Sequence, residues 1–154
     1  MSVVLGQPIP DFSVASTTGE MLNSATQKGR RFVLYFYPKD ATPGCTLESQ
    51  QFRDLHEQFQ AAKCDIYGVS RDSLKSHDKF RDNQCLPFAL LSDPDETLCR
   101  LFDVIKTKNM YGKQVQGIER STFLIDENGV LRHEWRKVKA DGHAQAVLDA
   151  VLST

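Results

Sequence analysis

The spacing of apolar residues changes along the chain, and each change marks a predicted element. Residues 32–37 form a continuous apolar and aromatic run that Pro38 ends, which is typical of a strand covered on both faces. A loop is expected at 39–44, and a helical period follows over residues 45–62. The residues expected on the buried face of this helix are Phe52, Leu55, Phe59 and Ala62.

Shorter runs predict the remaining elements. Strands are expected at residues 12–14, 65–70, 87–91, 121–125 and 130–135, and helices at 73–84 and 143–152. The Asn-Gly pair at positions 128–129 predicts a hairpin between the last two strands. A helix is also expected after residue 92, because Asp93 can cap it, Pro94 fits the first helical position and Glu96 can complete a capping box.

The order of these elements predicts an α/β fold. Strands alternate with helices, and a hairpin and a last helix follow, which favours a mixed central sheet with helices on both faces. This is the outline of a thioredoxin-like fold with insertions and an N-terminal extension. No repeat, low-complexity tract or linker divides the chain, so we expect residues 1–154 to form a single domain.

Composition narrows the possible partners. The net charge is −1, from 19 basic and 20 acidic residues, which gives no electrostatic reason to expect a nucleic acid or an anionic membrane as partner. The run at 32–37 is far too short to span a bilayer. The first residues carry neither a basic region nor a cleavage-like site, so we expect a soluble cytoplasmic protein.

The four cysteines, at positions 45, 64, 85 and 99, are expected to be reduced. Neither a close cysteine pair nor a close histidine pair is present, which argues against a structural zinc site. Cys64 opens an apolar strand and Cys99 lies on the core side of a helix, so both are expected to be inert packing residues.

Cys45 is different, because it lies where a buried strand gives way to an amphipathic helix. In the first turn of that helix its sulfur faces unpaired N–H groups and the positive end of the helix dipole, which favour a nucleophilic thiolate. Pro43 makes the loop rigid, and Gly44 lets the backbone come close to a molecule bound beside Cys45. Thr42 is three residues before Cys45, so its hydroxyl can reach the same binding pocket. Arg120, just before a predicted strand, is the candidate for a fixed positive charge, although most arginines are solvated surface residues.

These residues resemble those of a known family. Pro38, Thr42 and Cys45 form a Pro-x-x-x-Thr-x-x-Cys pattern, and Arg120 begins an Arg-Ser-Thr-Phe-Leu-Ile-Asp strand, as in the peroxiredoxins. The segments that resemble the bacterioferritin comigratory protein, or Q-type, subfamily are Tyr35-Phe36-Tyr37-Pro38-Lys39, Gly68-Val69-Ser70-Arg71-Asp72-Ser73, Leu91-Ser92-Asp93 and Gly117-Ile118-Glu119-Arg120. The resemblance runs nearly end to end, from residues 6–12 to the final helix.

The resemblance implies a thiol peroxidase that needs no metal, flavin or haem. Cys45 would attack hydrogen peroxide or an organic hydroperoxide and become a sulfenic acid. Thioredoxin, glutaredoxin or glutathione would then reduce it back to the thiol, and the cellular role would be antioxidant defence. Thr42 would hold the peroxide, Arg120 would stabilise the thiolate and the breaking O–O bond, and Pro38 would shield the pocket from water. Glu48 would orient Arg120, although a glutamate in a first turn also favours the helix dipole. We expect the protein to act as a monomer.

The resolving step stays open at this point. Some members of the subfamily carry a resolving cysteine at the position of Gln50, and others carry it near that of Arg81; this chain has a cysteine at neither position. Cys85, near the end of the 73–84 helix, could resolve Cys45 after local unfolding, but a disulfide needs Cα atoms within about 7 Å. Such an opening would expose Leu47 and Phe80, both expected in the core. We therefore favour an external thiol and a one-cysteine enzyme.

Two other functions would also use a reactive cysteine at this position. A thioredoxin-like disulfide reductase needs two nearby thiols, and Thr42 stands where its first cysteine would be. A redox sensor or holdase would use the same reactive cysteine as a peroxidase, so catalytic turnover has to separate the two.

Overall fold

Strand β3 (Arg31–Phe36) organises the molecule, because its apolar side chains point alternately to two hydrophobic clusters. Val33 and Tyr35 belong to one cluster, while Leu34 and Phe36 belong to the other. All four side chains are fully buried. The continuous apolar run in the sequence therefore does mark a strand that is covered on both faces.

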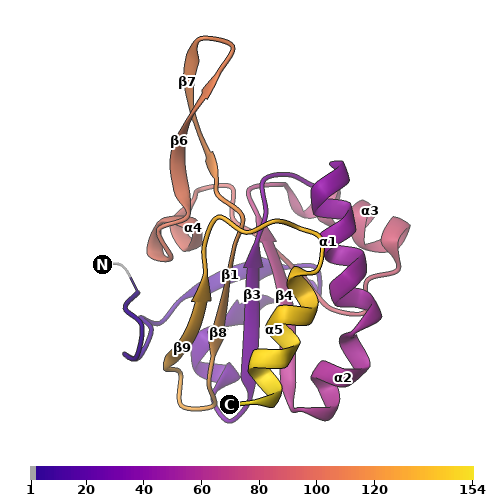
Figure 1. The fold of residues 1–154 in the computed structure, drawn as a ribbon, viewed down its shortest axis with the longest axis vertical. Coiled ribbons are helices and arrows are strands. Elements are labelled where there is room, and N and C mark those ends of the chain that lie inside the picture. Colours follow the sequence, from indigo (N-terminus) through magenta and orange to yellow (C-terminus); the bar gives the residue numbers. More distant parts are fainter. Residues whose placement is uncertain (1–2) are drawn as a thin grey trace.

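The computed structural model describes residues 3–154, whose elements Figure 1 labels. The other strands are β1 (Ser13–Ser16), β2 (Met21–Asn23), β4 (Cys64–Ser70), β5 (Leu90–Ser92), β6 (Ile105–Met110), β7 (Lys113–Ile118), β8 (Ser121–Ile125) and β9 (Leu131–Trp135). The α-helices are α1 (Pro43–Asp54), α2 (His56–Ala61), α3 (Leu74–Gln84), α4 (Thr97–Leu101) and α5 (His143–Leu152), and a 3-10 helix, η1, covers Ser24–Gln27.

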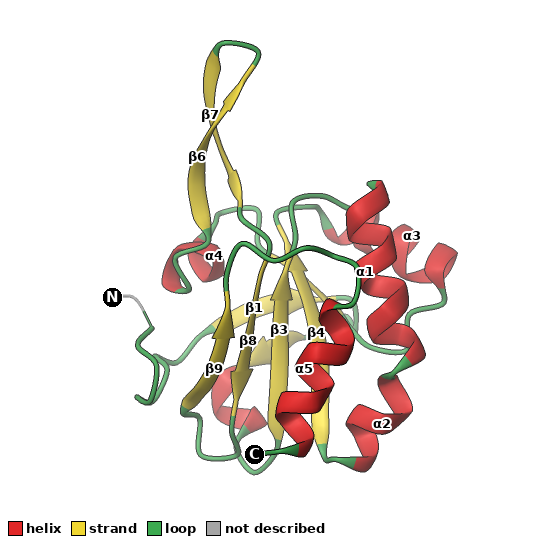
Figure 2. Ribbon diagram, viewed as in Figure 1, coloured by secondary structure: helices red, strands yellow, loops and turns green. Residues whose placement is uncertain are grey.

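Seven strands form one mixed sheet in the order β2-β1-β5-β4-β3-β8-β9. Strands β3, β4 and β5 run parallel, and the strands added outside them are antiparallel to their neighbours. Phe52 of α1, Phe59 of α2, Phe80 of α3 and Val147 of α5 pack on one face, whereas Leu98 of α4 packs on the other (Figure 2). The predicted mixed sheet with helices on both faces is confirmed.

Several predicted boundaries were wrong. The helix expected over 45–62 is two helices that meet at Leu55, because the apolar period continues across the break and hides it. The third strand spans 90–92 rather than 87–91. Helix α4 begins at Thr97 and not at Pro94. Glu96 has a left-handed backbone there, while the Asp93 carboxylate accepts hydrogen bonds from the N–H groups of Leu98 and Cys99.

The β6–β7 hairpin was missed, together with β2 and η1. It projects from the end of the sheet at which β3 and β4 finish (Figure 1). Its residues are mostly polar and exposed, so it lacks the apolar alternation that marks a half-buried strand. The sequence signal for this hairpin is Gly112 in the turn. Tyr111 and Gly112 both have positive φ, as a two-residue hairpin turn requires, and glycine adopts this conformation readily.

No helix within the described range 3–154 is long and apolar enough to cross a membrane.

Gly68 in β4 has no room for a side chain. A Cβ atom there would lie 2.8 Å from Leu90 and 2.8 Å from the Tyr35 ring, both in the core. We predict that Gly68→Ala lowers the free energy of unfolding by about 1–3 kcal/mol, because overpacking strains its neighbours. Urea unfolding measures the change. Gly117→Ala is the matched control, since the nearest atom there is 3.8 Å away. Equal stability of the two variants would contradict the prediction.

Candidate active site

Cys45 lies in the first turn of α1, at the end of the loop that follows β3. Thr42 is the N-cap residue and Pro43 occupies the first turn of the helix. The Cys45 side chain is 1% exposed. Because the first N–H groups of a helix lack intrahelical partners, the sulfur is placed beside a concentration of partial positive charge, as the sequence predicted.

Arg120 makes the central contact of the site. It follows β7, and its Nη2 atom donates a hydrogen bond to Cys45 Sγ at 3.4 Å. Its Nη1 atom lies 2.6 Å from Glu48 Oε1 in an ion pair. One guanidinium therefore joins the sulfur to a carboxylate one helical turn further along α1. The family resemblance predicted that Cys45, Glu48 and Arg120 act together, and in the structure Arg120 contacts both of the others.

Gly44 makes this close approach possible. A Cβ atom at Gly44 would lie 3.1 Å from Arg120 Nη2, which is tighter than an ordinary contact. The backbone φ of Gly44 is not in the left-handed region, so the requirement for glycine comes from the arginine rather than from the turn.

Glu48 is fully buried, and burial raises its pKa to about 7 although the charge and hydrogen bond of Arg120 lower it. Its second carboxylate oxygen, Oε2, has no hydrogen-bond partner among the described residues. For Arg120, burial lowers the pKa, but the charges of Glu48 and Cys45 raise it overall, so the guanidinium stays charged. The carboxylate is thus the member of the pair that changes charge near neutral pH.

Thr42 and Pro38 lie at the edge of this group. The Thr42 hydroxyl donates to the Lys39 carbonyl at 2.8 Å, which leaves its oxygen able to accept a hydrogen bond from a bound molecule. Pro38 and Arg120 both line a cleft of about 410 Å³. The structure does not place Thr42 or Cys45 among the residues that line this cleft.

A buried network that the sequence did not reveal supports the loop. The Asp40 carboxylate accepts from the Tyr37 hydroxyl at 2.6 Å and from the Ser76 hydroxyl at 2.9 Å, and it lies 2.7 Å from His77 Nδ1. The Asp40 N–H donates to the Asp72 carboxylate at 2.9 Å. Burial raises the pKa of Tyr37 well above its usual value, so its hydroxyl remains a donor. Asp40 is therefore fixed from several sides, two residues before Thr42.

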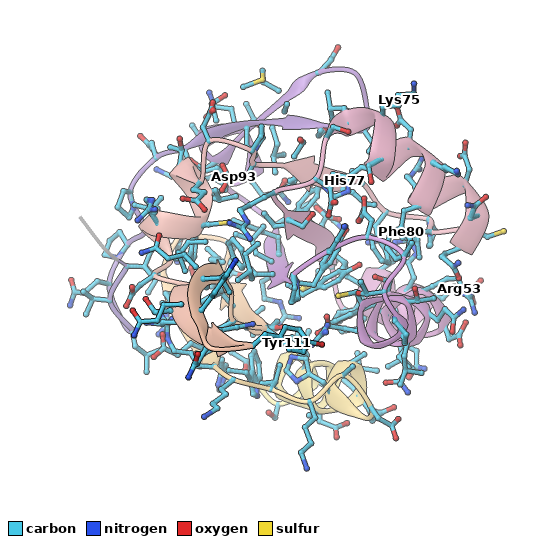
Figure 3. The ribbon with its side chains drawn as sticks, turned by 90° about the horizontal axis from the view of Figure 1, so that it is seen from above. Arg53, Lys75, His77, Phe80, Asp93 and Tyr111 are labelled. Carbon is cyan, nitrogen blue, oxygen red and sulfur yellow. The ribbon has the colours of Figure 1, made fainter. Side chains whose placement is uncertain are left out.

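His77 connects this network to helix α3 and strand β5. Its Nε2 atom lies 2.9 Å from the Leu91 carbonyl, which accepts a hydrogen bond but cannot donate one, so Nε2 carries a hydrogen. Figure 3 shows His77 and Phe80 on the side of α3 that faces the interior. Asp40, Asp72 and His77 each have one possible metal-ligand atom within 4.8 Å of the other two. These side chains already form hydrogen bonds with protein groups, which explains their closeness without a metal ion.

His143 is a second buried histidine beside the site. Burial lowers its pKa to about 4, and the charge of Arg120 acts in the same direction. The ring is therefore neutral near pH 7, and its Nε2 atom lies 2.7 Å from the Thr122 hydroxyl. Its neutral state leaves Arg120 as the positive charge that contacts the sulfur.

The other cysteines differ from Cys45 in their surroundings. Cys64 and Cys99 are fully buried, and burial raises the pKa of both thiols, to about 12 for Cys64. Cys85 is exposed at the end of α3, where its backbone is left-handed. The expectation that Leu47 belongs to the core was wrong, because its side chain is 38% exposed, whereas Phe80 is buried.

Comparison with known proteins agrees with this geometry. A model of the AhpC/TSA family matches residues 5–134. Peroxiredoxin Bcp of Xanthomonas campestris pv. campestris is 54% identical over 141 residues, which cover 92% of this chain and 88% of that protein. Peroxiredoxin Bcp of Bacillus subtilis is 48% identical over 151 residues, which cover 98% and 96%. The chain belongs to the AhpC/TSA family, as a Q-type peroxiredoxin.

A solved structure of a similar peroxiredoxin confirms the thioredoxin-like fold. Bacterioferritin comigratory protein of Xanthomonas campestris, described for its alkyl peroxide reduction activity, matches with a TM-score of 0.89 at 52% identity. The match covers 92% of this chain and 90% of that one. The predicted family and fold class are therefore confirmed, and the protein is a thiol peroxidase.

The raised pKa of Glu48 predicts a pH dependence of stability. Its pKa is about 7 when folded and close to the ordinary 4.5 when unfolded, so between these values the folded state binds more protons. The contribution of Glu48 to the free energy of unfolding therefore falls as pH rises through this window, by up to about 3 kcal/mol. We predict that Glu48→Gln removes this fall.

Urea unfolding of the parent and Glu48→Gln at pH 5 and pH 8 measures the effect. The variant is expected to gain about 2–3 kcal/mol relative to the parent between the two values. Glu57→Gln, which changes an exposed glutamate, is the control and should follow the parent. Parallel behaviour of Glu48→Gln and the parent would show that the folded carboxyl titrates in its ordinary range.

Proposed function

We propose that Cys45 is the peroxidatic residue and that it reduces peroxides through a sulfenic acid. The observation that carries this proposal is the Arg120 hydrogen bond to Cys45 Sγ at the start of α1. Both the guanidinium and the helix N-terminus favour the thiolate, which is the nucleophilic form of cysteine. Cys64 and Cys99 are also buried, and burial raises the pKa of both thiols, but among the described residues no guanidinium donates a hydrogen bond to either sulfur.

The chemistry follows from this placement. The Cys45 thiolate attacks one peroxide oxygen, and an S–O bond forms as the O–O bond breaks, so that the sulfur is oxidised by two electrons. The departing oxygen takes up one proton and leaves as water or an alcohol. Arg120 stabilises the negative charge that moves from the sulfur to the departing oxygen, and Glu48 holds the guanidinium in place. Thr42 accepts a hydrogen bond from the bound peroxide, and Pro38 limits access of water.

An external thiol then restores Cys45. One thiol condenses with the sulfenic acid to form a mixed disulfide and water, and a second thiol releases Cys45 as the external disulfide forms. Two contacts oppose resolution by Cys85: Gln50 Nε2 donates to Gln84 Oε1 at 2.8 Å, and Arg53 Nη1 donates to the Gln84 carbonyl at 2.9 Å. These hydrogen bonds tie α1 to the end of α3, and local unfolding would break them.

The cellular setting belongs to the same proposal. We propose that the protein serves antioxidant defence in the cytoplasm as a single-domain monomer, with thioredoxin, glutaredoxin or glutathione as the donor. The two hydrophobic clusters share β3, which supports one domain over residues 3–154, while residues 1–2 of the expected 1–154 lie outside the described part.

Removing the proposed nucleophile tests the assignment. We predict that Cys45→Ser abolishes peroxide consumption, because a serine hydroxyl is not ionised near neutral pH and cannot take up the peroxide oxygen. Cys64→Ser and Cys99→Ser are controls that should keep most of the activity, since both thiols are buried and the Arg120 guanidinium donates its hydrogen bonds to Glu48 and Cys45 instead. Steady-state peroxide consumption with excess thiol is the assay. Many turnovers per protein would exclude a stoichiometric sensor, and an active Cys45→Ser protein would overturn the assignment.

The choice of reductant gives a separate prediction. We expect Cys85→Ser to keep turnover with a small thiol, and we expect peroxide with glutathione to leave a mixed disulfide on Cys45. Intact mass of the parent and Cys85→Ser proteins, with and without glutathione, measures both. A quantitative 45–85 disulfide in the parent, with turnover lost in Cys85→Ser, would contradict the one-cysteine mechanism but not the peroxidase function.

A further inference from the structure

A cationic cleft opens beside the active site. Among the described residues that line it, Lys106, Lys108, Lys137 and Arg120 are basic, and Glu119 is acidic. We propose that this cleft binds the carboxylate of a small molecule that reacts at Cys45. The proposal rests on the proposed peroxidase function, and it extends that function to the class of molecule that the site selects.

The three lysines line the same cleft although they come from two separate segments of the chain. Lys106 and Lys108 are two positions apart on β6, so their side chains share one face of the hairpin. Residues 105–118 contain no aspartate or glutamate, so the hairpin has a charge of one sign. Lys137 follows β9, and the next residue, Val138, donates its N–H to the Arg120 carbonyl at 3.1 Å. Two separate segments therefore bring positive charge to the arginine that contacts the sulfur.

Two of these basic residues, Lys108 and Lys137, form no ion pair with an acidic residue in the part of the chain that the structure describes. Lys106 pairs with Asp103 at 3.3 Å, and Arg120 is engaged by Glu48. Lys108 donates to the uncharged carbonyl of Ile118 at 3.1 Å, and Lys137 is exposed. Lys108 and Lys137 are thus the residues best able to attract an anion.

The size of the cleft also exceeds what a bare peroxide needs. Its volume, measured as the space open to the centre of a water-sized sphere, is about 410 Å³, whereas one water molecule needs about 10–15 Å³ by the same measure. The extra room suits an organic group, and the lysines suit a carboxylate, which accepts strong charge-assisted hydrogen bonds. Two kinds of reactant share this chemistry: an organic hydroperoxide that carries a carboxylate, and a reducing thiol that carries one.

Two half-reactions separate these sources. In the first, the reduced protein is mixed with cumene hydroperoxide or its para-carboxylate derivative, and the second-order rate constants are measured. In the second, protein oxidised by one equivalent of hydrogen peroxide is mixed with 2-mercaptoethanol or 3-mercaptopropionate. In the first pair a carboxylate replaces a ring hydrogen, and in the second it replaces a hydroxyl. The intrinsic reactivity of each reagent is the same for every variant, so a change in the anionic-to-neutral rate ratio between variants isolates the effect of the protein on the carboxylate.

The ratio is compared between the parent, the double variant Lys108→Gln with Lys137→Gln, and the control Lys75→Gln. Figure 3 shows Lys75 on α3, across the molecule from Tyr111 at the tip of the hairpin. We expect the double variant to lower the ratio by roughly three- to tenfold in at least one half-reaction, since each lost charge acts over a few ångströms near water. The parent ratio should also fall as salt screens the lysines, and Lys75→Gln should match the parent.

A drop in the first half-reaction identifies an anionic hydroperoxide, and a drop in the second identifies an anionic thiol; a drop in both means that the cleft serves both. Ratios within twofold of the parent in both half-reactions would overturn the cleft assignment. Turnover of the neutral cumene hydroperoxide by the parent keeps this outcome distinct from a failure of the proposed function, which would abolish turnover altogether.

Discussion

The Arg120 guanidinium, held between a sulfur and a buried carboxylate, is the interaction on which the site depends. It contacts Cys45 through one nitrogen and Glu48 through another, and both partners belong to α1. A bidentate guanidinium fixes direction as well as charge, which a lysine ammonium would not do. Gly44 gives it space and His143 remains neutral beside it, so the surrounding residues preserve this geometry without competing with it.

The Arg120–Glu48 pair also explains why Glu48 tolerates an unfavourable position. A fully buried carboxylate with one oxygen unpartnered costs stability, and the ion pair offsets this cost in part. Such a cost is typical of residues retained for activity, because a stable core alone would not need the charge. The Asp40 network serves the other side of the site, since it fixes the loop that carries Pro38 and Thr42.

The sequence predicted those features that leave a local pattern. The buried strand β3, the helix that carries Cys45 in its first turn and the hairpin at residues 126–129 follow from period and turn chemistry, although α1 begins at Pro43 rather than at Cys45. The cysteine and arginine were paired through the family resemblance, since 75 residues separate them and spacing alone does not reveal their contact. The break at Leu55 and the role of His77 depend on tertiary packing, and the β6–β7 hairpin lacks an apolar face. A single sequence carries little signal for any of these three features.

The projecting hairpin has a consequence for how copies of the protein meet in solution. Within residues 3–154 its two strands pair only with each other, so each has an outer edge of backbone groups that another chain could extend. Lys106, Lys108 and Lys113 line these strands without an acidic neighbour between residues 105 and 118. Two such hairpins approaching edge to edge would bring like charges together. The lysines that favour small anions would therefore also discourage the strand exchange and aggregation that an exposed β-ribbon otherwise invites.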